Sequence, residues 1–218
     1  NRDVALYASD AGTRIDAADL WVASTGTRQS GSYGHGAMIE YGATMMLAGA
    51  RFDGQAGSGL VLVNATATVD GLQLEAGPPP AEDALVAGVA GSSKSVIHLR
   101  GSRLLQPFRI GVAGSRSELN LTDVAIVGAA FVTATPPPGQ AWDQPADGIA
   151  TFEGILDVER SVVANSARAA LLQVNASDSR VDSSAFFGGR YGVVASSGSG
   201  ATLDATMVAG QSEPTGAV

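Results

Sequence analysis

The sequence predicts an all-β fold, a right-handed single-stranded parallel β-helix of about eight coils. Three observations predict it: short strands alternate apolar and polar residues, the strands recur with a base period of 22 or 23 residues, and glycine or serine recurs between them. A coil of this length cannot bury its inward face alone. Neighbouring coils must therefore stack, which completes both a common core and a hydrogen-bond ladder.

The first strand of each coil ends on an inward apolar residue, the anchor, and a second large apolar residue follows five positions later. Both positions are expected inside the solenoid, because successive residues of a strand point to opposite faces. The predicted anchors are Ile15, Leu47, Val69, Leu99, Leu121, Val158, Val181 and Leu203. The predicted second positions are Leu20, Phe52, Leu74, Leu104, Ile126, Val163, Phe186 and Val208.

Corner residues and a third strand complete each coil. Small residues stand three positions after the anchor, and glycine often stands seven positions after it, as turns require. The third strand often opens with glycine, as in 59–63, 148–151 and 192–194. Alternation along this strand predicts a set of outward residues, namely Val61, Val63, Ala113, Ala150, Gln173 and Ala195.

Composition supports this fold and excludes several classes of protein. The 218 residues are 45% hydrophobic and only 16% charged, and they include 28 glycines and no cysteine. Disulfides and thiolate metal sites are therefore excluded. The net charge of −8, with Lys and Arg scattered, makes nucleic acid a poor partner. The longest apolar stretch, 124–134, is about half of what a membrane-spanning helix needs, so no membrane span is expected.

Residues 119–128, which read LNLTDVAIVG, carry the best match to a known pattern. They resemble the parallel β-helix repeat of the pectin-lyase-like superfamily, and the resemblance covers nearly the whole chain. It implies a fold and no activity. In the resembled lyases and galacturonases, catalytic acids or metal ligands project from the glycine-opened sheet. The outward residues of that sheet are apolar here, so no catalytic residue is carried over. The chain also departs from the family at the first corner, where asparagine is usual.

Three coils are long because they carry inserts just after the second corner, at 25–35, 77–84 and 133–147. Inserts at one angular position are expected to emerge on one edge of the solenoid. In the resembled family, loops at this corner flank the groove that holds polysaccharide. Residues 1–218 are expected to form one β-helix domain, and, because neither end supplies a capping segment, a fragment of a longer chain.

The inserts and their ends hold the predicted ligand-binding residues. Aromatic side chains beside carboxylates commonly bind sugars or protein partners, although loop aromatics also pack back on a scaffold. The candidates are Tyr33, His35, Trp142, Asp143 and Asp147. Trp21 follows a predicted core position and is interpreted as structural. The two histidines, His35 and His98, lie on different coils, so a zinc site is not expected.

Acidic residues recur directly after the anchors, at Asp16, Asp70, Glu159, Asp182 and Asp204. Stacked carboxylates repel one another unless a cation or an arginine intervenes. Glu159, Asp182 and Asp204 are therefore candidates for a Ca²⁺ site or for a pair of catalytic acids. The favoured interpretation is an exposed row whose repulsion nearby arginines reduce, and no cofactor is then needed.

The sequence therefore favours a non-catalytic β-helical structural or recognition segment of an exported or surface bacterial protein, extracellular or periplasmic. Its expected partners are a polysaccharide or a surface protein, bound through the inserted loops. The alternative is a polysaccharide lyase or a glycoside hydrolase of the pectin-lyase-like type. Activity on neutral and acidic polysaccharides, with and without Ca²⁺, separates the two hypotheses.

Overall fold

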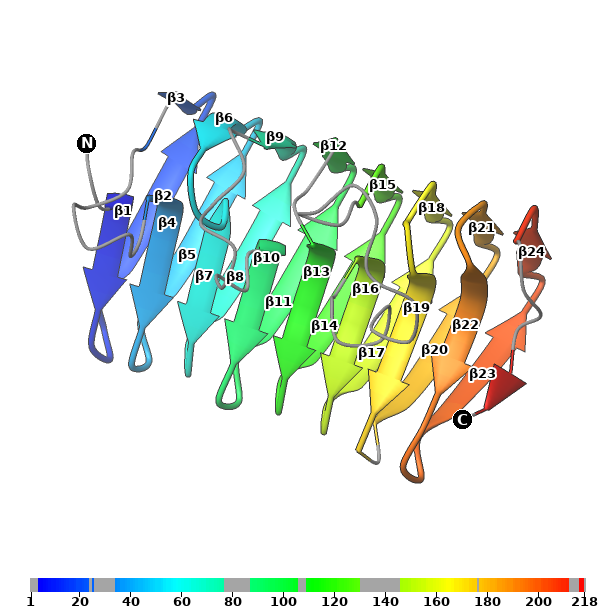
Figure 1. The fold of residues 1–218 in the computed structure, drawn as a ribbon. Helices are drawn as coiled ribbons and strands as arrows, with labels where there is room; N and C mark the ends of the chain where they lie inside the picture. Colours follow the sequence, from blue (N-terminus) through cyan, green and yellow to red (C-terminus); the bar gives the residue numbers. More distant parts are fainter. Residues whose placement is uncertain are drawn as a thin grey trace.

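A computed structural model describes residues 4–23, 25, 34–76, 87–105, 109–129, 146–175, 177–211 and 216–217. These residues form a parallel β-helix (Figure 1). Three parallel sheets run along the solenoid, and each strand pairs with the strand one complete coil further along the chain. In the described part of the chain, no helix is long and apolar enough to cross a membrane.

The three sheets, here named A, B and C, are visited in that order by every coil. Sheet A contains β1 (Val4–Ser9), β4 (His35–Glu40), β7 (Leu60–Val63), β10 (Ala87–Ser92), β13 (Ile110–Ser115), β16 (Asp147–Phe152), β19 (Ala169–Val174), β22 (Tyr191–Ala195) and β25 (Gly216–Ala217). Sheet B contains β2 (Arg14–Ala18), β5 (Thr44–Ala48), β8 (Thr66–Asp70), β11 (Val96–Arg100), β14 (Glu118–Thr122), β17 (Ile155–Glu159), β20 (Asp178–Asp182) and β23 (Gly200–Asp204). Sheet C contains β3 (Trp21–Ala23), β6 (Arg51–Gln55), β9 (Gln73–Ala76), β12 (Arg103–Leu105), β15 (Ala125–Val127), β18 (Val162–Ala164), β21 (Ala185–Phe187) and β24 (Met207–Ala209).

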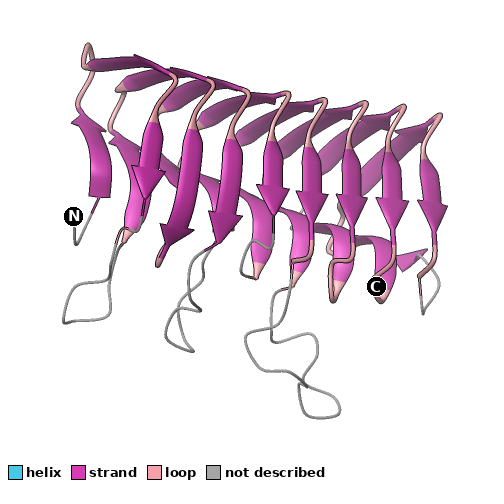
Figure 2. Cartoon of the chain, turned by 90° about the horizontal axis from the view of Figure 1, so that it is seen from above, coloured by secondary structure: helices cyan, strands magenta, loops and turns pink. Residues whose placement is uncertain are grey.

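The three sheets form the walls of a prism (Figure 2). The core consists of apolar columns inside it. Leu121 pairs with Val158, Val158 pairs with Val181, and all three side chains are buried in one hydrophobic cluster. In sheet C, Ile126, Val163 and Phe186 form an equivalent column. The predicted stacking of anchors is therefore confirmed from the second coil onward.

The predicted register of the first coil is wrong by two residues. Ala17, not Ile15, pairs with Leu47, and Val22, not Leu20, pairs with Phe52. The first period is thus 30 residues (47 − 17) rather than 32. Both Ile15 and Ala17 pack against the core, and the sequence pattern favoured the larger of the two.

Each corner between sheets B and C holds a residue with positive φ, from Asp19 in the first coil to Ala205 in the last. The N–H of this residue donates to the carbonyl that ends the sheet B strand of the next coil, as from Arg160 to Asp182 at 3.1 Å. Serine follows in several coils. Ser161 Oγ donates to the carbonyl of Glu159 at 2.9 Å and accepts the N–H of Val124 at 3.0 Å.

In several coils a glycine at the start of the sheet A strand lies in an inward column, where an added Cβ would come within 3 Å of a backbone carbonyl of the next coil, as at Gly36, Gly59, Gly111 and Gly148. A Cβ at Gly111 would lie 2.4 Å from Ile126 Cγ2 and 2.5 Å from the carbonyl oxygen of Gly148 in the next coil. A backbone carbonyl of the ladder cannot move aside without disturbing its hydrogen bonds. Glycine is therefore favoured where such a carbonyl and a sheet C side chain both approach the position, as at Gly111. Ala170 occupies the column in β19, which shows that the limit is not the same in every coil.

Strand order and register do not fix the hand of the solenoid. Right-handed winding stays a prediction, consistent with the strong preference of parallel crossover connections.

Candidate functional site

The outward face of sheet A is apolar over most of its length. Its central outward column contains Met38, Val61, Ala90, Ala113, Ala150, Leu172 and Val194. Ala150, Leu172 and Val194 belong to a second buried cluster, separate from the core. The predicted outward positions of Gln173 and Ala195 are wrong. Gln173 is 0% exposed, pairs with Thr151, and contacts Ser179 Oγ with its Nε2.

His35 and Asp147 both open strands of sheet A, β4 and β16, at the corner between sheets C and A. The strands β7, β10 and β13 lie between them in the ladder. Four ladder steps correspond to about 19 Å, so the structure does not bring these two candidates together. The other three candidates, Tyr33, Trp142 and Asp143, lie outside the described residues.

His35 is half-buried against the next coil. The backbone N–H of Ser58 donates to His35 Nδ1 at 3.0 Å, and Nδ1 must be unprotonated to accept it. Burial lowers the pKa of His35 below its ordinary value of 6.5. The imidazole is therefore neutral near pH 7, and one of its nitrogens is used to connect two coils.

Asp147 is fully buried and forms an ion pair with Arg168, which is nearly buried. Arg168 Nε donates to Asp147 Oδ1 at 2.9 Å, Arg168 Nη2 donates to Oδ2, and the N–H of Ala169 donates to Oδ1 at 3.2 Å. Burial raises the pKa of Asp147, and the bonds from Arg168 and Ala169 oppose this effect. Both carboxylate oxygens are thus engaged within the protein, and a ligand contact by Asp147 stays a prediction.

The first and third inserts leave and rejoin the coil at equivalent points. The carbonyls of Thr25 and Gly34, at the two ends of the first insert, accept N–H groups from the successive residues 56 and 57 at 3.0 Å each. The carbonyls of Ala129 and Ala146, at the ends of the third, accept N–H groups from residues 167 and 168 at 2.8 and 2.9 Å. Each insert therefore interrupts the coil between two positions that are adjacent in the next coil.

A buried polar contact reinforces the ends of the first insert. Thr25 is 2% exposed, and its hydroxyl contacts both the carbonyl of Gly34 and Gln55 Oε1. Gln55 Nε2 donates to the backbone carbonyls of Val22 and Asp53 at 3.1 and 2.9 Å. This contact joins Thr25 to Gly34 and Gln55, residues that no local sequence pattern relates to one another.

The predicted stacking of acids is correct for Glu159, Asp182 and Asp204, which pair in register across β17, β20 and β23. Asp16 does not belong to this row, because Ala18 takes that position in the first coil. Arg160 forms ion pairs with Glu159 and with Asp123. Among the described residues, no set of three or more acidic, histidine or cysteine side chains is arranged to hold a metal ion.

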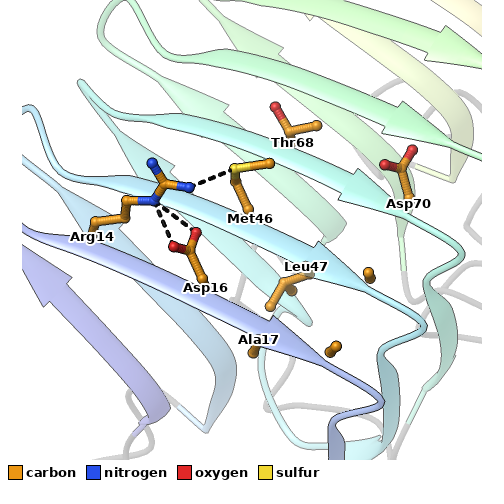
Figure 3. A pocket seen from close by; sticks show the side chains of 9 residues that line it. Arg14, Asp16, Ala17, Met46, Leu47, Thr68 and Asp70 are labelled. Carbon is orange, nitrogen blue, oxygen red and sulfur yellow. Dashed lines mark hydrogen bonds and ion pairs between the residues drawn. The ribbon is translucent and has the colours of Figure 1, made fainter.

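A shallow hollow of about 330 Å³ lies on the outer face of sheet B over the first three coils (Figure 3). Its lining includes Ala18 and Ala48, which are small where most later coils carry charged residues. Arg14 forms an ion pair with Asp16 at 2.7 Å, and its Nη2 lies 3.1 Å from Met46 Sδ (Figure 3). Four of its nine lining residues have polar side chains, Arg14, Asp16, Thr68 and Asp70, and the first two are paired with each other.

Trp21 is an outward residue of β3. It is 69% exposed on β3, and its Nε1 donates to Asp53 Oδ2 on β6 at 3.0 Å. Its place next to Val22, an inward residue of the same strand, already implies an outward side chain by alternation. The structural interpretation of Trp21 stays a prediction, and its exposed indole is also open to a ligand.

Comparisons with known proteins define no family. No protein-family model matches the chain, and no curated protein matches it. Among solved structures, the chain is similar to PfbA, a surface adhesin of Streptococcus pneumoniae. The TM-score is 0.39 and the sequence identity 9%, over 93% of this chain and 72% of that chain. A similarity of this degree carries no information on function.

Proposed function

We propose that the chain is a non-catalytic recognition scaffold of an exported or surface protein, which binds a polysaccharide or a protein partner through its inserts. The observation that carries the proposal is the geometry of the insert ends. Two inserts begin and end at hydrogen-bonded positions that are adjacent in the next coil. A rigid ladder that presents variable loops on one edge is the usual arrangement of a binding surface.

The carboxylates of sheet A support a non-catalytic role. Its described strands contain two of them, Glu40 and Asp147. Glu40 Oε2 accepts a hydrogen bond from Tyr7 at 2.9 Å, and Asp147 is paired with Arg168. Glu40 is the last residue of β4 and Asp147 is the first residue of β16, and these two strands are four ladder steps apart. Glycoside hydrolysis needs a pair within about 10 Å.

Insert deletion tests the proposal. Deleting 26–33 joins Thr25 to Gly34, and deleting 131–145 joins residues 130 and 146. The spacing between ladder partners in each shortened coil then becomes 22 residues (30 − 8 and 37 − 15), as between Leu47 and Val69. Both variants are expected to retain the β-sheet circular dichroism spectrum, because the ladder around the insert is unchanged. We expect one or both to lose at least tenfold in affinity for a polysaccharide that the intact chain binds in a panel of xylan, glucomannan and polygalacturonate.

A substitution on another face, Asp157→Asn on sheet B, serves as the control and should leave binding unchanged. Folded deletion variants that bind like the intact chain would contradict the proposal. Release of reducing ends or of unsaturated products from any of these polysaccharides would instead establish an enzyme.

A further inference from the structure

Three side chains form a fixed cluster on the outer face of sheet C. Trp21 Nε1 donates to Asp53 Oδ2 at 3.0 Å, and Arg51 Nε donates to the same oxygen at 2.6 Å. Trp21 and Arg51 are ladder partners on β3 and β6, which lie side by side at one end of the solenoid (Figure 1). The indole is therefore held in one orientation while most of its surface faces solvent.

Polar side chains extend this cluster over the next two strands. Gln73 and Arg103 continue the column of Trp21 and Arg51, and Glu75 continues the column of Asp53. Gln73, Glu75 and Arg103 are exposed, and no residue in the described part of the chain forms an ion pair or side-chain hydrogen bond with them. They line a hollow of about 190 Å³ together with Arg51 and Asp53.

The chemistry of this surface fits a neutral sugar. The face of an exposed indole offers apolar area with a partial negative charge, which suits the C–H face of a pyranose ring. Carboxylate, amide and guanidinium groups are planar and form paired hydrogen bonds, which suits adjacent hydroxyls. Two arginines, Arg51 and Arg103, balance two acids, Asp53 and Glu75, so the surface selects neither anion nor cation.

We propose that the outer face of sheet C over β3, β6, β9 and β12 binds a neutral oligosaccharide. One ring stacks on Trp21, and hydroxyls of the following rings bind Asp53 Oδ1, Gln73 and Arg103. Three ladder steps separate Trp21 from Arg103, about 14 Å, which accommodates more than one ring. None of the insert residues belongs to this site, so it goes beyond the proposed function. The two proposals can be tested independently of each other.

The same sheet supplies a matched control. Phe187 is an outward aromatic residue on β21, 37% exposed, and its ladder neighbours Ala164 and Ala209 are small and apolar. Phe187 therefore presents an exposed aromatic ring that has no carboxylate, amide or guanidinium group on its ladder neighbours. If exposed aromatic surface alone bound the ligand, Phe187→Ala and Trp21→Ala would weaken binding alike.

Tryptophan fluorescence tests the proposal, because the chain has only two tryptophans. In a Trp142→Phe background, emission reports Trp21 alone. Titration with hexasaccharides of xylose, mannose, β-1,4-linked glucose and α-1,4-linked glucose should give a saturable change with at least one of them, at submillimolar Kd. By calorimetry, Trp21→Ala should weaken that binding at least tenfold and Asp53→Asn severalfold, whereas Phe187→Ala should change it less than twofold. The 131–145 deletion should retain it.

Several results would overturn the proposal. They are the absence of saturable binding by all four hexasaccharides, or unchanged affinity in a Trp21→Ala variant whose circular dichroism is native. Loss of the binding in the 131–145 deletion would assign it to the inserts instead. Concentration-dependent self-association that Trp21→Ala abolishes would show that the surface is an interface between copies of the chain.

Discussion

At the scale of single residues, Gly111 lies in the inward column of sheet A, where the neighbouring atoms leave no room for a side chain. Gly111→Ala would place a Cβ 2.5 Å from a backbone carbonyl and 2.4 Å from Ile126. We expect it to lower the free energy of unfolding by about 2 kcal/mol or more, as overpacking of a rigid core does. Urea denaturation measures the loss. Gly200→Ala is the matched control, because a Cβ there meets nothing within 4 Å; an equal loss in both variants would contradict the steric explanation.

His35 gives a pH-dependent contribution to stability. Burial lowers its pKa in the folded state, so the unfolded chain binds more protons as the pH falls through 6.5. The stability that His35 contributes is therefore present above this pH and decreases below it. We expect the difference in unfolding free energy between the native chain and His35→Asn to shrink between pH 7.5 and 5.5. A difference that is constant over this range would show that His35 does not titrate as described.

At the scale of elements, the corner serines connect consecutive coils. Ser161 is 2% exposed and satisfies one donor and one acceptor of the backbone. We expect Ser161→Ala to cost about 1–3 kcal/mol, because the buried N–H of Val124 loses its partner. The neighbouring Ser183→Ala, at an exposed position, should change stability by no more than about 0.5 kcal/mol. Thermal unfolding of both variants provides the comparison.

The sequence predicted these elements better than it predicted the site. Periodic apolar positions identified the strands of sheets B and C from the second coil onward, because burial imposes a strict period of two. The period of two gave the wrong register where two residues of one strand both pack inward, Ile15 and Ala17. It gave the wrong face where a polar residue points inward, at Gln173. The contacts of Trp21 with Asp53 join residues 32 positions apart, and no local pattern predicts such a pair.

At the scale of the whole molecule, the register between successive coils determines which residues become neighbours. Inserts that are far apart in sequence leave at one corner, Trp21 and Arg103 come within three ladder steps, and Glu159 stacks on Asp182. Both proposed binding surfaces depend on this register. A shift of one residue would turn every outward side chain of a strand inward.

Engineered cysteine pairs test the register most directly, because the chain has no cysteine of its own. Asn120 and Asp157 are outward ladder partners on β14 and β17, about 4.8 Å apart, within the Cα range of a disulfide. We expect the Asn120→Cys, Asp157→Cys variant to form an intramolecular disulfide on mild oxidation, detected by mass spectrometry. The pair Asn120→Cys, Ile155→Cys, about 8 Å apart, should stay reduced. Preferential oxidation of this second pair, or of neither pair in a folded protein, would contradict the register.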